Sequence, residues 1–364
     1  MSLRPSCQPL GKPNTSFLSW AVFKVIGDVD TSMDADAETI LGWARMGVLI
    51  LCMGWAAWFD HKERRVLNEH WMVWTKPIVF IWSLDLLIQG PHWSVWLTAS
   101  ALLAYASGSV IGRPTMKDAG QGNRVDQIVL LWYLLSAIGL VAGALRFMEV
   151  SPLDVLIGEA AMEATLWWSY IGALFTLFVI DLAWRFRFIH GGADAKALMW
   201  VTLLFPSWAE VPVYSDTAMD EIVLHLPPSL SLLIWGGFLF VLIPIILLLR
   251  NIATGSVRSV SDIFMAWMSL SVPLASVRER HVWILSDTMD MPNGETVLIH
   301  KKRAPRRTPT DEEMNDHIKR LEELGVERIW VSLKLPLLLF LFPAILPLLM
   351  IGDPMATLLP LLLP

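Results

Sequence analysis

The sequence predicts an all-α polytopic membrane protein with about eight transmembrane helices and a small α+β cytoplasmic domain before the last of them. Three observations indicate this class. Hydrophobic residues make up 55% of the 364 residues and charged residues 17%, and the mean hydropathy is +0.53. The apolar residues gather in stretches long enough to cross a bilayer. Basic residues crowd some connecting loops and are missing from others.

The predicted spans are the apolar stretches between charges, because a helix needs roughly 17 to 25 mainly apolar residues to cross the hydrocarbon. The second of them contains Lys76, Pro77 and Asp85, and the sixth has only a short apolar run after Lys196, so these two follow the pattern least closely. The spans lie at residues 39–60, 71–90, 92–112, 127–146, 164–184, 194–212, 228–250 and 332–352.

Loop charges predict the orientation, because Lys and Arg near a span stay in the cytoplasm. They occur in residues 61–76, 113–125, 185–196 and 250–334, and none occurs in 147–163, 207–227 or 353–364. Eight spans with both ends outside place every basic loop in the cytoplasm of a multi-pass cell-membrane protein. Residues 1–38 are then an extracytoplasmic tail, and their acidic run lacks the Gly and Glu of a calcium loop.

The predicted membrane domain covers residues 39–250, of which 91–163 form inserted spans. Residues 251–330 form a cytoplasmic module, and residues 331–364 form the last span and the C-terminal tail.

Three patterns describe the cytoplasmic module. The apolar stretch Ile263–Val277 is predicted as an interfacial helix beneath the membrane, because a crossing there would export the basic residues that follow. Alternation over residues 281–302 around a Pro-Asn-Gly turn predicts a hairpin. Thr310 and Glu313 predict a capping box at the start of a helix that Gly325 ends.

Composition and missing motifs exclude several classes of function. The net charge of −6 offers no basic field for nucleic acid. Two cysteines, Cys7 and Cys52, are too few for a disulfide framework and lack the spacing of a thiolate zinc site. His61 and His70 are predicted to be solvated, and the HExxH and GxSG motifs of other membrane proteases are missing. No metal and no cofactor are predicted.

Carboxylates inside or at the edge of a bilayer are costly, so each needs a reason. The predicted topology places Asp60 and Asp194 at the same cytoplasmic level, where they can meet. Gly191-Gly192 before Asp194 allows positive φ and the close approach of a neighbouring helix. Taken singly, each aspartate is also explained as a helix cap or a charge at the membrane edge.

Two further carboxylates are predicted to be auxiliary. Asp181 has Arg185 four residues on as an ion-pair partner. Asp85 is expected to face a wet groove or the Lys76 side of the interior.

At the paired aspartates the chain resembles the type IV prepilin peptidases. Asp60 followed by Arg64-Arg65-Val66-Leu67-Asn68 resembles their D-x-x-x-R-R-hydrophobic-P-N signature, and Gly191-Gly192-Ala193-Asp194-Ala195-Lys196 resembles their GxGD-x-K motif. The hydrophilic module before the last span is similar to the archaeal preflagellin peptidase branch. The resemblance covers about residues 39–76, 181–212 and, more loosely, 228–352. It implies that Asp60 and Asp194 are catalytic, and the supporting motif residues are Arg64, Arg65, Asn68, Gly191, Gly192, Ala193 and Lys196.

The chain departs from the family pattern at three points. Ala193 replaces the second glycine of the motif, and Leu67 replaces the usual proline. Four predicted spans separate the two aspartates where compact members have two. An even number keeps both aspartates on one face of the membrane, so the insertion is compatible with catalysis.

The resemblance implies a membrane-embedded aspartic endopeptidase that cleaves the basic leader peptides of prepilin-like or preflagellin-like proteins at the cytoplasmic membrane face. Two carboxyl groups close together share one proton and activate water against the scissile carbonyl. Anionic lipids are a second expected partner, of the basic run around Arg64-Arg65 and of residues 300–307. N-methylation of the product is unsupported, because the paired CxxC motifs of bifunctional members are missing.

Two alternatives remain open. A non-proteolytic membrane protein, such as a proton-coupled transporter, would use Asp85 and Asp181 as relay carboxylates. No inverted repeat with broken helices supports this reading. A signal-peptide-peptidase-like role would call for Tyr before the first aspartate, where this chain has Phe59.

Overall fold

The computed structural model describes residues 37–213, 225–278, 282–292, 295–305, 307 and 309–357. The described part is mostly helical with a small sheet region, as the composition predicts. Five of its helices are long and apolar enough to cross a membrane, which fits a multi-pass membrane protein. These are α2 (Ala37–Glu63), α3 (Asn68–Gln89), α6 (Arg124–Arg146), α8 (Met162–Arg185) and α10 (Pro228–Ala253). Nearly all of the predicted acidic tail lies outside the described residues.

The other three predicted spans are shorter or broken, so the prediction of eight full spans is not confirmed. Helix α4 covers Trp93–Ser107, and α9 covers Gly192–Leu204. The predicted last span is divided into α13 (Leu338–Leu341) and α14 (Ile345–Ile351) around Pro343. Proline cannot donate the helical hydrogen bond and clashes with the preceding turn, which weakens a helix at Pro343, although α3 continues through Pro77.

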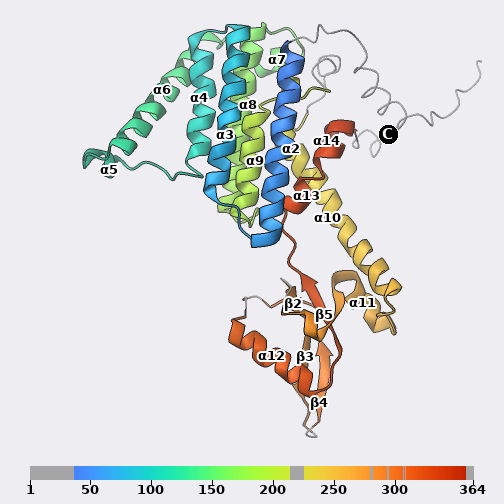
Figure 1. Ribbon diagram of the computed structural model, residues 1–364. Helices are drawn as coiled ribbons and strands as arrows, with labels where there is room; N and C mark the ends of the chain where they lie inside the picture. Colours follow the sequence, from blue (N-terminus) through green and yellow to red (C-terminus); the bar gives the residue numbers. More distant parts are fainter. Residues whose placement is uncertain are drawn as a thin grey trace, which may run out of the picture. The chain divides into compact units, whose positions relative to one another are not determined.

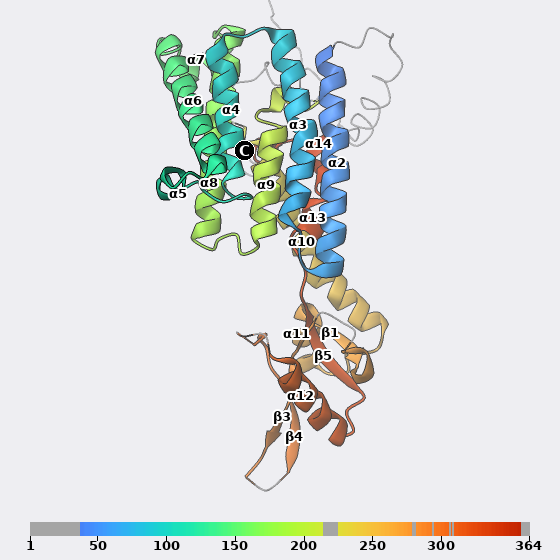
Figure 2. The same ribbon diagram turned by 60° about the vertical axis from the view of Figure 1, so that its left-hand side comes forward.

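The chain divides into two compact units, and α2 contributes to both. The first unit comprises Met1–Cys52, Leu67–Leu232 and Ile345–Pro364. In its described part, α3, α4, α8 and α9 run side by side (Figure 1 and Figure 2). Helix α9 is buried almost all round from Ala195 to Leu204, which explains how a helix too short to span a bilayer is stable here.

Helix α6 packs against α4 and α8 through glycines. A Cβ atom on Gly139 would lie 2.1 Å from Leu97 Cβ of α4, and one on Gly143 would lie 2.1 Å from Trp167 Nε1 of α8. Such small residues at a four-residue spacing let helix backbones approach closely in a membrane. Two short helices flank this region, α5 (Met116–Gly120) and α7 (Pro152–Leu156).

The second unit comprises Met53–Val66 and Leu233–Ala344 and contains the strands. One antiparallel sheet has the order β1-β5-β2, and β3 pairs with β4 in a separate hairpin. Helix α12 (Asp311–Glu323) contacts β3 and buries Ile318 and Leu321 in the core of this unit (Figure 1). The strands are β1 (Leu270–Pro273), β2 (Val282–Ile284), β3 (Ser286–Asp290), β4 (Thr296–His300) and β5 (Arg328–Leu333).

Two predictions for this unit that depend on residues close together in the sequence, the capped helix and the hairpin, are confirmed. Thr310 and Glu313 form the predicted capping box of α12, and Gly325 adopts a φ of 69° just after the helix. The hairpin is present as β3 and β4, while two of its predicted turn residues, Asn293 and Gly294, lie outside the described residues.

The predicted interfacial helix over Ile263–Val277 is wrong in its second half. Helix α11 covers Val260–Met268, and the chain then enters strand β1. Leu270 and Val272 are buried and Ser271 between them is less so, which is the two-residue period of a strand. Helix α11 itself exposes Phe264 and Trp267 and is strongly amphipathic, as a helix lying at a membrane surface would be.

Candidate active site

Asp60 lies in the last turn of α2 and is 9% exposed. The helix ends because Arg64 adopts a φ of 56° and donates its backbone N–H to the Asp60 carbonyl oxygen. Arg65 is exposed. The first motif therefore places one buried carboxylate and two basic side chains at a helix end.

Asp194 lies in the first turn of α9, and Gly191 is the residue that precedes the helix. A Cβ atom on Gly191 would lie only 2.1 Å from Asp194 Oδ2, so the carboxylate occupies the space that any other side chain would fill. A Cβ on Gly192 would lie 3.2 Å from the Trp184 ring. The expectation of positive φ is wrong, because Gly191 has a φ of −85° and Gly192 is not in the left-handed region. The two glycines instead leave space for the Asp194 carboxylate and the Trp184 ring.

The two motif segments are joined by a hydrogen bond. Lys196 Nζ donates to Asn68 Oδ1 at 2.7 Å, although the two residues are 128 positions apart. Asn68 Nδ2 in turn donates to the Val110 carbonyl oxygen at 2.9 Å. Lys196 also lies 5.8 Å from the centre of the Trp184 ring. The side chains of two predicted supporting residues, one from each motif, are thus in direct contact.

The two aspartates that the motif resemblance implies to be catalytic belong to different units. Asp60 is part of the second unit and Asp194 of the first, so the close approach of their carboxyl groups stays a prediction. Ala193, which replaces the second motif glycine, follows Gly192 in the first turn of α9.

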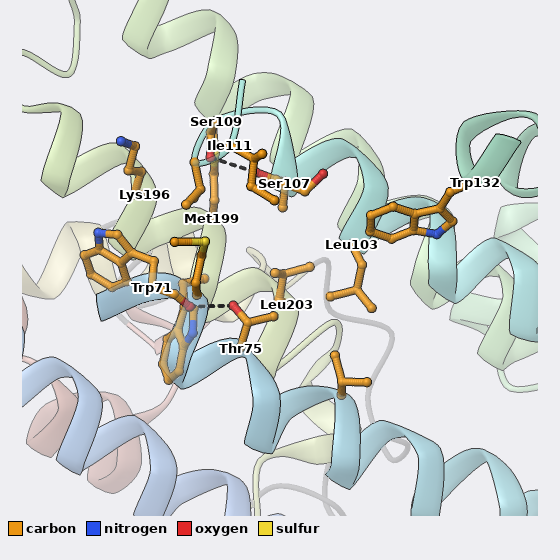
Figure 3. A pocket seen from close by; sticks show the side chains of 15 residues that line it. Trp71, Thr75, Leu103, Ser107, Ser109, Ile111, Trp132, Lys196, Met199 and Leu203 are labelled. Carbon is orange, nitrogen blue, oxygen red and sulfur yellow. Dashed lines mark hydrogen bonds between the residues drawn. The ribbon is translucent and has the colours of Figure 1, made fainter. Parts of the chain in front are cut away.

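An apolar pocket of about 390 Å³ lies next to Lys196. Its walls come from α3, the end of α4, α6 and α9, and Lys196 and Trp132 lie at opposite ends of it (Figure 3). Trp71, Met199 and Leu203 supply much of the apolar lining, and Thr75 uses its hydroxyl to bond the Trp71 carbonyl oxygen at 2.7 Å. Such a lining suits an apolar segment that carries one polar or negative group towards the lysine.

The prediction that Asp85 faces a wet groove or Lys76 is wrong. Asp85 instead faces Arg45 of α2. Arg45 Nη2 donates to Asp85 Oδ2 at 2.6 Å, and the two residues are 3% and 5% exposed. Gln89 Nε2 donates to the other carboxylate oxygen at 2.9 Å. Sequence reasoning missed Arg45, and the signal was present, because an arginine inside a predicted span needs an acidic partner in another span.

Asp181 forms the predicted ion pair with Arg185, at 2.9 Å. It also accepts from Arg113 Nη2 at 3.1 Å and from the Tyr105 hydroxyl at 3.0 Å, and all three donors meet on Oδ2. The Tyr105 and Arg113 contacts cross between segments and were not predicted.

Within the residues that the structure describes, no group of three or more His, Cys, Asp or Glu could hold a metal ion. The prediction that His70 is solvated is wrong, because the side chain is half-buried. Its Nε2 lies 3.4 Å from Cys52 Sγ, and its ring packs edge-on with the Trp71 ring.

Comparison with known proteins identifies no family. No family model matches the chain, and no curated protein matches it.

Proposed function

We propose that the protein is a membrane aspartic endopeptidase that cleaves basic leader peptides of prepilin-like or preflagellin-like substrates at the cytoplasmic membrane face. The observation that carries the proposal is the hydrogen bond between Lys196 and Asn68. Lys196 follows Asp194 by two residues, and Asn68 follows Asp60 by eight. A short stretch of chain therefore leads from each partner of this bond to one of the aspartates.

The proposed chemistry needs the two carboxyl groups to share a proton. Like charges a few ångströms apart cannot both ionise easily, so the pair titrates as one unit. The ionised carboxylate accepts a proton from water while the protonated carboxyl polarises the scissile carbonyl. The burial of Asp60 at a helix end, and the space that Gly191 leaves for Asp194, fit side chains held in fixed positions.

The proton-coupled transporter receives less support. Asp85 and Asp181, its expected relay carboxylates, each form ion pairs with arginine. A cationic partner favours the ionised carboxylate and so opposes the protonation that a relay requires. The peptidase reading assigns these pairs a structural role.

The experiment is cleavage of a reporter by the purified full chain in detergent. The reporter carries a short basic leader, an apolar helix and a C-terminal tag, and the product is identified by N-terminal sequencing. We expect a single cut at the junction of leader and helix. A matched reporter with its leader lysines and arginines replaced by glutamine should be cut more slowly. Leader-bearing candidate substrates from the same organism are tested in the same way. If neither the reporter nor these substrates are cut, the proposal is contradicted.

A further inference from the structure

A second cavity, away from the motif residues, opens between α6 and α8 in the first unit. It has a volume of about 690 Å³ and forms an open groove rather than an enclosed void. Its floor is the small-residue face of α4 at Ala101 and Ala104, and its apolar walls include Leu130 of α6 and Phe178 of α8. None of the peptidase motif residues lines this groove.

The groove lies beside the part of α6 that diverges from α4, whereas α6 lies closest to its neighbours at two glycines. At Gly139 and Gly143 the absence of side chains lets α6 lie directly against α4 and α8. Nearer the start of α6, Trp132 Nε1 donates a hydrogen bond to Ser100 Oγ of α4 at 2.6 Å. Figure 1 shows α6 diverging from α4 towards α5. The space between is a wedge whose lining is apolar.

Two arginines lie at the wide end of the wedge. Arg113 and Arg185 line the groove and share the single carboxylate of Asp181, which leaves one net positive charge. Their side chains remain 60% and 52% exposed, whereas that of Asp181 is 11% exposed. Each guanidinium has five N–H donors, so most of them are not used by Asp181. An anion placed there meets donors on both sides.

We propose that this groove binds one anionic phospholipid, with a hydrocarbon chain in the wedge and the phosphate between Arg113 and Arg185. The apolar walls match the chain, and the paired guanidiniums match the phosphate, which arginine binds through parallel N–H groups. The loop that carries Arg113 is predicted to be cytoplasmic, the level of the inner-leaflet headgroups. The proposal is independent of the peptidase reading.

Native mass spectrometry of the full chain in detergent tests it, with phosphatidylglycerol and phosphatidylcholine of the same chain length as probes. We expect one phosphatidylglycerol to be retained in preference to phosphatidylcholine. Arg113→Gln and Arg185→Gln should each weaken phosphatidylglycerol binding about fivefold, as one basic residue near a membrane surface does. Arg124→Gln is the matched control, because it removes a charge from the same predicted loop without lining the groove.

Two further variants separate lipid binding from a structural role. Asp181→Asn removes the competing carboxylate and should leave phosphatidylglycerol binding as tight as before or tighter. If the arginines served only to hold Asp181, this variant would resemble their loss. Ala137→Phe fills the exposed apolar wall and should weaken both lipids while all charges remain.

Several results would overturn the proposal. They are equal retention of the two lipids by the unaltered protein, an Arg124→Gln effect as large as that of Arg113→Gln, and a loss of binding in Asp181→Asn. Displacement of the lipid by soluble glycerol phosphate would show a site for a free phosphate instead. Cross-linking of a leader-bearing substrate into the groove, with no lipid retained, would assign it to the substrate.

Discussion

At the scale of single residues, two buried carboxylates of the described helices, Asp85 and Asp181, form ion pairs with arginine. The Arg45–Asp85 pair lies between two helices, with Gln89 on the second carboxylate oxygen. Removing one partner of a buried pair leaves the other charge uncompensated, whereas replacing both with apolar residues is often neutral. The pair is therefore expected to specify how α2 meets α3 in the first unit more than to add stability.

Arg45→Met should destabilise the protein by about 3 to 5 kcal/mol, because Asp85 would remain buried without its partner. The double variant Arg45→Met, Asp85→Leu should recover most of that loss. Thermal unfolding in one detergent, followed by circular dichroism, measures both. A double variant as unstable as the single one would mean that the pair does not act as a unit.

Gly191→Ala tests whether the position of the Asp194 carboxylate matters. The backbone φ of −85° is open to alanine, so the only conflict is between the new Cβ and Asp194 Oδ2. A displacement of about 1 Å can cost on the order of 100-fold in rate, so leader cleavage should fall steeply while the unfolding temperature changes little. Gly47→Ala in α2, where a Cβ would meet nothing within 4 Å, is the control. Unchanged cleavage in Gly191→Ala would show that the position of the Asp194 carboxylate does not limit the reaction.

At the scale of elements, features that depend on neighbouring residues in the sequence could be predicted, and features that depend on contacts between distant segments could not. The capping box at Thr310 follows from spacing alone. The end of α11 at Met268 could not be predicted from spacing, because it depends on the pairing of β1 with β5. Likewise, Arg45 and Asp85 are visible in the sequence, but their pairing depends on the rotation of two helices about their axes. In the candidate site, the role of the motif residues stays a prediction from the resemblance, and the bond between Lys196 and Asn68 was not foreseen.

Asp287 of β3 forms an ion pair with Lys301, the residue after β4, and its carboxylate lies 3.2 Å from His317 Nε2 of α12, which makes an ion pair when His317 is protonated. Burial alone would raise the pKa of Asp287, but bonds from Lys301 and the Thr288 N–H, with the nearby charges, hold the pKa below its ordinary value. The unfolded chain therefore binds the proton more tightly. The stabilisation is complete above the ordinary pKa of about 3.9 and is lost as the pH falls through the lower folded value.

Hydrogen exchange of residues 286–300 in the full chain measures this effect. Between pH 6 and pH 3 the protection of the hairpin should fall, after correction for the intrinsic exchange rate. Asp287→Asn should show weaker protection at pH 6 and a smaller change with pH. The same pH dependence in Asp287→Asn would assign the effect to another group.

At the scale of the whole molecule, a cytoplasmic active site requires one particular orientation of the chain in the membrane. Five helices in the described part of the chain are long and apolar enough to span the bilayer, and the loop charges predict that the strand-bearing module is cytoplasmic. In a Cys7→Ser background, Asp290→Cys and Glu159→Cys place exposed thiols on opposite predicted sides. A thiol reagent that cannot cross the membrane should label Glu159→Cys in intact cells and Asp290→Cys only after lysis. The reverse pattern would show that the orientation is wrong.

The most direct test of the proposed aspartic dyad is leader cleavage by four variants at equal expression. Asp60→Asn and Asp194→Asn should each abolish cleavage, because neither carboxyl group can share a proton with an amide. The double variant should be no worse than either single one, since the two residues act as a unit. Asp316→Asn, exposed on α12, should cleave normally. Wild-type cleavage by a correctly inserted Asp60→Asn or Asp194→Asn variant would contradict the account.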